Sequence, residues 1–187
     1  MIAAVKLMES LFTQHGYFIP KLRVSCGWPS SGGLGQKRKT LGQCWPASAA
    51  ADKLPQIFIS PWLEAKSNIG VLPTLVHEVV HAVVGNDQKH NKVFRKCALA
   101  VGLEGKMTST IASPVLMEVI EGWQVRELGP YPHGKLDPRK SPVAKQTTRM
   151  IKMECPDCEF VARTSQKWLD MYGPVQCPGC KTLTKVE

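Results

Sequence analysis

The apolar positions between residues 71 and 103 follow the spacing of α-helices more regularly than anywhere else in the chain. Apolar residues three and four apart form one stripe along a helix. The first run shows this spacing at Leu72, Leu75, Val76, Val79, Val80 and Val83. Gly85 follows it and is typical of a helix end. Because residues 92–103 show a second run, the pattern predicts two consecutive helices joined by a short turn.

Helix and strand patterns also alternate in the rest of the first 128 residues. Helical spacing covers residues 2–15 and 114–128, and the second of these runs has Ser113 as a candidate N-cap before Pro114. Strand-like stretches are shorter, and they cover residues 21–28, 40–45 and 56–60. The mixture predicts an α+β fold in which a small antiparallel sheet packs with a few helices and leaves a cleft between them.

The composition changes after residue 128, and this change divides the chain into three parts. We expect a first domain over residues 1–128, a basic proline-containing linker over residues 129–153 and a small domain over residues 154–187. The linker contains one acidic residue, Asp137, and six basic ones: Lys135, Arg139, Lys140, Lys145, Arg149 and Lys152. These six are candidate contacts to nucleic-acid phosphates. A solvated spacer that has no partner is the alternative interpretation.

Candidate catalytic chemistry lies in the first of the two regular helices. His77 and His81 are four residues apart, so both can point at one metal ion from the same helix face. Glu78 would then lie beside the metal, where a base for a zinc-bound water belongs. His90 follows the turn and is the natural third ligand, although Glu104 or Glu118 could also supply one. The alternative is a core helix with incidental histidines.

The cysteines indicate a second metal site near the end of the chain. Cys155 and Cys158 form one CxxC pair, Cys177 and Cys180 form another, and eighteen residues separate the pairs. This spacing predicts a four-cysteine zinc ribbon whose closed shell is structural and not catalytic. Cys26 and Cys44 fall in neighbouring strand candidates, so a shared metal or a disulfide is conceivable there. Buried free thiols are the simpler interpretation of this pair and of Cys97.

These motifs together resemble a known family. The string HEVVHAVVG…KHNKVFRKCALAVGLEGKM is similar to the SprT-like (Spartan-type) zinc metallopeptidases, most of all to their phage and bacterial members with an appended ribbon. The resemblance implies a zincin-like domain with zinc on His77, His81 and His90 and with Glu78 as the base. The family usually has Gly after the third histidine, where this chain has Asn91, the residue that best tolerates a left-handed backbone after Gly.

We therefore predict a zinc-dependent endopeptidase with two Zn²⁺ per chain, one catalytic and one structural. The resemblance implies that its substrates are DNA-associated proteins, with DNA bound through the linker and the ribbon. Catalytically inactive binding to nucleic acid, or to a protein of transcription or replication, is the main alternative, and hydrolysis of a non-protein amide is a third. Because the cysteine pairs favour a reducing compartment, and no stretch is long and apolar enough to span a membrane, we expect a cytoplasmic protein, in the host cytoplasm if phage-encoded.

Overall fold

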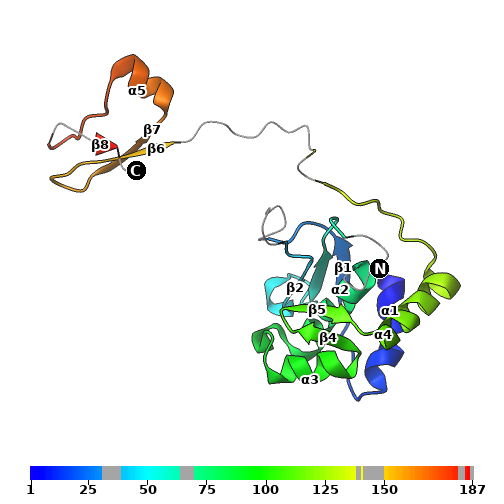
Figure 1. Ribbon diagram of the computed structural model, residues 1–187. Helices are drawn as coiled ribbons and strands as arrows, with labels where there is room; N and C mark the ends of the chain where they lie inside the picture. Colours follow the sequence, from blue (N-terminus) through cyan, green and yellow to red (C-terminus); the bar gives the residue numbers. More distant parts are fainter. Residues whose placement is uncertain (31–38, 64–69, 138–139, 141–149, 181–183, 186–187) are drawn as a thin grey trace. The chain divides into compact units, whose positions relative to one another are not determined.

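The structure is a computed structural model that describes residues 1–30, 39–63, 70–137, 140, 150–180 and 184–185. The chain forms two compact units, Met1–Lys140 and Ser141–Glu187. Both contain helices and small sheets, so the predicted α+β class is confirmed (Figure 1). Among the described residues, no helix combines the length and the apolar character needed to cross a bilayer.

A three-stranded sheet forms one side of the first unit. Its strands are β1 (Arg23–Cys26), β2 (Gly42–Trp45) and β3 (Gln56–Ile59), in the order β1-β3-β2. β2 pairs antiparallel with β3, but β1 runs parallel to it, so the sheet is mixed and the predicted purely antiparallel sheet is wrong. β3 has the two most buried residues of the sheet, Ile57 and Ile59, and takes the central position, so β1 and β2 pair with β3 and not with each other.

Helix α2 (Val71–Val84) runs through the core of this unit. It contacts the sheet at β2 and β3, and it also contacts α1 (Ile2–Thr13) and α3 (Lys92–Ala100). Its apolar stripe is completely buried at Leu75, Val76, Val79 and Val80. Gly85 ends the helix as predicted, with a φ of 95° that favours glycine. The two regular helices expected from the sequence are therefore present.

A hairpin and a fourth helix complete the first unit. The hairpin of β4 (Leu103–Lys106) and β5 (Ser109–Ala112) contacts α3 and α2 (Figure 1). Helix α4 (Pro114–Trp123) continues as a π-helical turn over Gln124–Leu128, and the Ser113 side chain accepts a hydrogen bond from the Leu116 N–H, so the predicted cap is confirmed.

The segment after residue 128 belongs in part to this unit. Tyr131 packs against the core, and the Leu136 N–H donates to the Pro61 carbonyl over 2.8 Å. The first unit therefore extends to Lys140, past the domain boundary predicted at residue 128.

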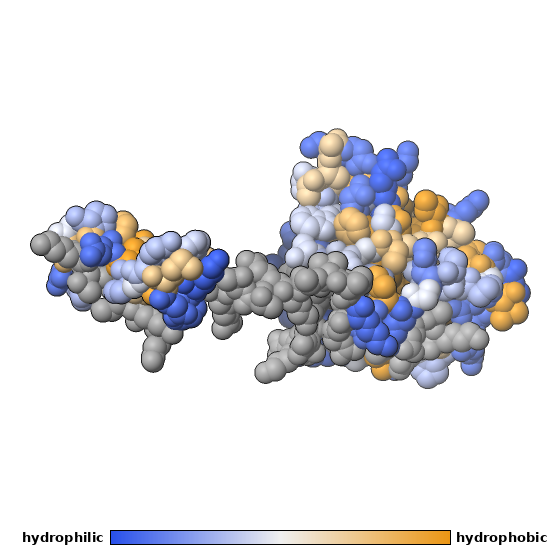
Figure 2. All heavy atoms as spheres, turned by 90° about the horizontal axis from the view of Figure 1, so that it is seen from above, coloured by the Kyte–Doolittle hydropathy of each residue, from blue (hydrophilic) through white to orange (hydrophobic). Residues whose placement is uncertain are grey.

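The second unit is small and is built around its cysteines. Strand β6 (Ile151–Glu154) pairs antiparallel with β7 (Val161–Thr164) and with β8 (Thr184–Lys185), and helix α5 (Gln166–Tyr172) follows β7. Its buried cluster contains Met153, Cys155 and Cys177. On the face shown in Figure 2, hydrophobic and hydrophilic residues are mixed over the surfaces of both units. A core this small predicts that a bound metal supplies much of the folding free energy.

Candidate metal centres

The three predicted histidine ligands of the first unit meet at one point. His77 and His81 project from one face of α2, and the Nε2 atom of His90 lies 3.3 Å from that of His77 and 3.2 Å from that of His81. Nitrogen ligands at about 2.0–2.1 Å from a tetrahedral zinc lie about 3.3–3.4 Å from one another. The spacing and chemistry of the three imidazoles therefore fit a zinc ion with a fourth position left for a water or substrate atom.

The turn between α2 and α3 brings His90 to this point. After Gly85 the chain makes a short 3-10 turn, and Lys89 has a φ of 48°. Asn91 has an extended backbone with φ −75°, so this position makes no use of the tolerance of Asn for a left-handed conformation. Its side chain instead accepts hydrogen bonds from the Val93 and Phe94 N–H groups, and so it caps α3. The cap, one residue after His90, fixes the start of α3 at Lys92.

The surroundings of the imidazoles favour their neutral form. The ring of Phe94, which is fully buried, contacts all three of them, with its centroid 4.4 Å from that of His81. Burial, together with the neighbouring histidines, lowers the pKa of His77 to about 3 and that of His81 to about 4, and burial also lowers the pKa of His90. Neutral imidazoles offer the lone pairs that a metal ligand needs.

Glu78 is held apart from this cluster, against the sheet. It is only 6% exposed, and its carboxylate accepts a hydrogen bond from the Cys44 N–H on β2. Burial raises the pKa of Glu78 to about 8, although the hydrogen bond from Cys44 acts in the opposite direction. A carboxyl group with a pKa near neutrality can both accept and donate a proton at physiological pH.

A cleft of about 480 Å³ opens over the three histidines and Glu78. Its walls come from β2, from α2 and the turn after it, and from the β4–β5 hairpin. Among the described residues they include Leu41, Gly42, Gln43, Cys44, Thr74, Asn86, Thr108, Ser109 and Thr110. This volume is within the range of about 300–1,000 Å³ that is typical of ligand pockets.

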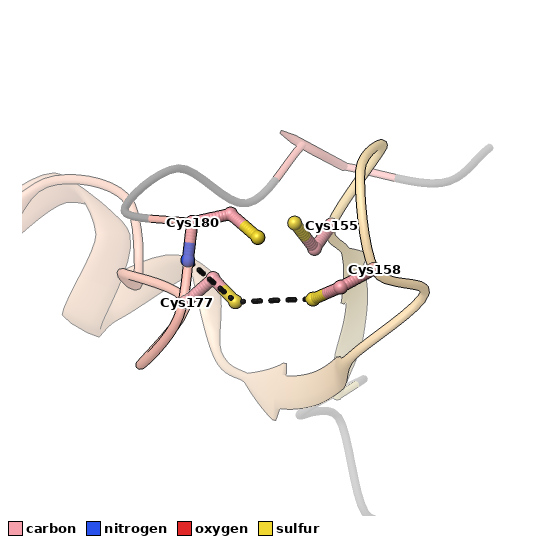
Figure 3. A group of neighbouring side chains, drawn as sticks. All are labelled: Cys155, Cys158, Cys177 and Cys180. Carbon is pink, nitrogen blue, oxygen red and sulfur yellow. Dashed lines mark hydrogen bonds between the residues drawn. The ribbon is translucent and has the colours of Figure 1, made fainter.

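The four cysteines of the second unit form the other candidate centre. Their side chains converge on one point, with one pair from each CxxC segment (Figure 3). The Sγ atoms of Cys158 and Cys177 are 3.5 Å apart, close to the about 3.8 Å expected for thiolates on one tetrahedral zinc. The Cys180 N–H donates to Cys177 Sγ over 3.4 Å and lowers the pKa of that thiol to about 7. The thiolate set fits a structural zinc.

The other predicted ligands and cysteine pairs do not meet. Glu104 and Glu118 are outside the three-histidine group that the described residues form. Cys26 is on β1 and Cys44 is on β2, and β3 lies between them, so the predicted adjacency of these two cysteines is wrong. Strands two positions apart are separated by about 9–10 Å, which is too far for a disulfide or a shared ion. Cys97 is fully buried, as expected for a free thiol in the core.

Tyr131 and His133 follow α4 and lie away from the histidine cluster. Burial, together with a hydrogen bond between the Tyr131 side chain and Cys26, raises the pKa of Tyr131 to about 12, and the Tyr131 ring packs against that of His133. Neither residue is among the described residues that line the cleft.

The six basic candidates for nucleic-acid contact are described only in part. Arg139, Lys145 and Arg149 lie outside the described residues, and Lys135 and Lys140 belong to the first unit. Lys152 lies in β6 and forms an ion pair with Glu154. One of the six charges is therefore already matched by an acidic neighbour.

Several residues of the cleft were not predicted from the sequence. Gly42 and Cys44 both contact Glu78. Asn86 contacts Cys44, and Thr110 contacts His77. Each of these contacts joins residues at least 33 positions apart along the chain, so no local motif marks them.

Comparison with known proteins adds no relative: no protein-family model, no curated protein and no solved structure matches the chain.

Proposed function

We propose that the chain is a zinc-dependent endopeptidase of the SprT-like type. The observation that carries the proposal is the arrangement of the first unit, in which the His90 Nε2 atom lies 3.2–3.3 Å from those of His81 and His77 and the three imidazoles share a cleft with one buried carboxylate. When bound by His77, His81 and His90, zinc would polarise the scissile carbonyl and acidify a water molecule. A purely structural histidine site has no need of a neighbouring buried carboxylate.

In this proposal Glu78 moves the protons. Its carboxylate accepts a proton from the attacking water and later passes it to the leaving amine. Burial supports the first step, because it raises the affinity of the Glu78 carboxylate for a proton and keeps bulk water away from it. The Cys44 N–H holds the carboxylate toward the cleft while the proton moves.

The sheet supports binding of an extended peptide. β2 is an edge strand, and it forms one wall of the cleft. The Leu41 carbonyl faces β3 and accepts from the Ser60 N–H, so the backbone groups of Gly42 face away from β3 by the alternation of an antiparallel pair. A substrate strand can therefore pair with β2 at Gly42, as edge strands do in other peptide-binding proteins.

The proposed substrates are proteins bound to DNA, and the proposed DNA contacts are the basic linker and the ribbon. Helix α5 carries Trp168 and Tyr172, which are 48% and 75% exposed and stack with their centroids 5.7 Å apart. The ammonium group of Lys167 lies 5.1 Å from the Trp168 ring. Exposed aromatic rings beside a cation can stack on unpaired bases.

The same aromatic pair favours the alternative, a catalytically inactive module that binds nucleic acid or a protein. In that case both metals would be structural and Glu78 would be dispensable. We would expect Glu78→Gln to leave every binding activity of the protein intact, and wild type to cleave nothing.

The test compares wild type with Glu78→Gln on a DNA-binding protein, with and without DNA. We expect two zinc ions in each variant, cleavage by wild type alone, and faster cleavage when DNA is present. A cleavage rate that is the same with and without DNA would support the peptidase and contradict the proposed role of DNA. Intact substrate in a sample that contains both zinc ions and binds DNA would overturn the peptidase in favour of the binding module.

A further inference from the structure

Gly42 lies against the carboxylate of Glu78. A Cβ atom at residue 42 would be 2.6 Å from Oε1 and 2.7 Å from Cγ of Glu78, and 2.8 Å from Cγ2 of Thr74. These distances are shorter than real Cβ contacts allow. Any side chain on this residue would therefore displace Glu78, Thr74 or the strand.

The backbone of Gly42 does not itself require glycine. Residue 42 is in a regular strand, paired with Ile59 of β3, and its φ is not in the left-handed region. Glycine weakens a strand interior, and where it occurs it often marks the close approach of another group. Here that group is the Glu78 side chain, so contact with Glu78, and not the backbone conformation, explains the glycine.

Two further contacts of β2 hold the carboxylate where Gly42 leaves room. The Cys44 N–H, two residues along the strand, donates to Glu78. The Cys44 carbonyl in turn accepts from Asn86 Nδ2 over 2.5 Å, and Cys44 Sγ lies 3.5 Å from Asn86 Oδ1. Because Asn86 comes two residues after the end of α2, it ties the strand to the helix that carries Glu78.

We propose that Gly42 is a positioning residue for Glu78. Its missing side chain lets β2 lie directly on the carboxylate, so that the Cys44 N–H can hold this group at the cleft. The inference rests on the proposed function, because it assigns Glu78 the role of base. It adds that the base is placed by the edge strand as well as by its own helix.

The test is Gly42→Ala in the full chain, with Gly134→Ala as the matched control, because a Cβ atom at residue 134 meets nothing within 4 Å. Displacement of a catalytic group by about 1 Å can cost about 100-fold in rate. We expect Gly42→Ala to lower kcat by about 10- to 100-fold, with KM and the zinc content close to wild type. Gly134→Ala should match wild type in all three.

The same substitution in a Thr74→Ser background guards against loss of folding. Thr74→Ser removes the Cγ2 atom that a new methyl group would also meet, so the remaining obstacle at residue 42 is Glu78. Thr74→Ser alone is the reference for the double variant, which we expect to be folded and zinc-loaded and to have a kcat about 10- to 100-fold lower than that reference. Wild-type kcat in either folded variant with Gly42→Ala would overturn the proposal.

A second readout separates this inference from the proposed function. An amide proton bonded to a carboxylate resonates downfield, so the Cys44 amide in a ¹H–¹⁵N spectrum reports the contact without any substrate. We expect this resonance to move upfield in Gly42→Ala and in Glu78→Gln, but not in Gly134→Ala. If wild type cleaves no substrate but the Cys44 resonance still moves in Gly42→Ala, the proposed peptidase function is wrong and the proposed positioning of Glu78 by Gly42 is supported. An unmoved resonance in Gly42→Ala would refute the positioning.

Discussion

The Nδ1 atom of His77 lies 2.8 Å from Oγ1 of Thr110, and this contact joins α2 to strand β5. The Nε2 atom of the same ring faces the other two histidines, so Nδ1 carries the hydrogen when Nε2 binds a metal. Thr110 then accepts the hydrogen bond, which fixes both the tautomer and the orientation of the ring.

Removal of the Thr110 hydroxyl should therefore weaken metal binding at the histidines. Partners of this kind are worth about 10- to 100-fold in metal affinity. We expect Thr110→Val to lower the affinity for Zn²⁺ or Co²⁺ by a factor in this range, as measured by competition with a chelator. The visible spectrum of bound Co²⁺ should change as well. Thr110→Ser keeps the acceptor and should restore both. An unchanged affinity in Thr110→Val would show that the contact does not support the ligand.

The pKa of Glu78 predicts how the stability of the metal-free protein varies with pH. Burial raises this pKa from 4.5 to about 8, so between these values the folded chain retains a proton that the unfolded chain releases. Stability contributed by this group is therefore present below about pH 4.5 and is lost as the pH rises toward 8.

Glu78→Gln has no such titration. Between pH 5 and pH 8 we expect wild type to lose at least about 1 kcal/mol of unfolding free energy relative to Glu78→Gln, since one pKa unit corresponds to about 1.4 kcal/mol. Urea unfolding in the presence of a chelator, followed by tryptophan fluorescence, measures the difference. Glu104→Gln, at an exposed position on β4, is the control and should run parallel to wild type. Parallel curves for Glu78→Gln as well would contradict the prediction.

Loss of one ribbon cysteine should unfold the second unit and spare the first. Cys155 is buried in the small core and is one of the four converging thiols. We expect Cys155→Ser to reduce the zinc content from two ions to one and to make residues 151–185 sensitive to protease, because the metal supplies the folding energy of so small a unit. Cys26→Ser should retain both ions, as measured by elemental analysis. Two ions in Cys155→Ser would argue against the four-cysteine site.

The apolar face of α2 should dominate the stability of the first unit. Val79 is fully buried, and its truncation removes two methyl groups from a packed core. We expect Val79→Ala to lower the unfolding free energy by about 2 kcal/mol. Val115 on α4 is also in a helix but is 71% exposed. Val115→Ala should therefore change the unfolding free energy by less than about 0.5 kcal/mol. Equal effects of the two substitutions in urea unfolding would show that the face is poorly packed.

Helix α2 could be predicted from the sequence because its signals are local. Its apolar spacing, the stop at Gly85 and the four-residue interval between His77 and His81 all lie within one short segment. His90 is also close in sequence, so little chain has to be ordered to bring it to the other two. The four cysteines were predictable for a similar reason, because each CxxC pair is a single turn.

The sheet could not be predicted in the same way. The stretches that became β1 and β2 look like a hairpin, since they flank one Ser- and Gly-rich loop, but β3 pairs with both of them. This pairing depends on which strand buries more surface in the finished fold. Strand β6 lies at the end of a basic, proline-containing stretch, where composition indicated a linker. The residues that contact Glu78 and His77 could not be predicted either, because they come from other elements that are distant in the sequence.

The contacts of Cys44 also bear on whether copies of the chain can pair through the edge of the sheet. An uncovered sheet edge is a template on which a second copy can add a strand and begin aggregation. At Cys44 the N–H is taken by Glu78 and the carbonyl by Asn86, so a second copy would have to break both bonds to continue along β2. The residues that place the base thus also shorten the edge through which copies of the chain could associate.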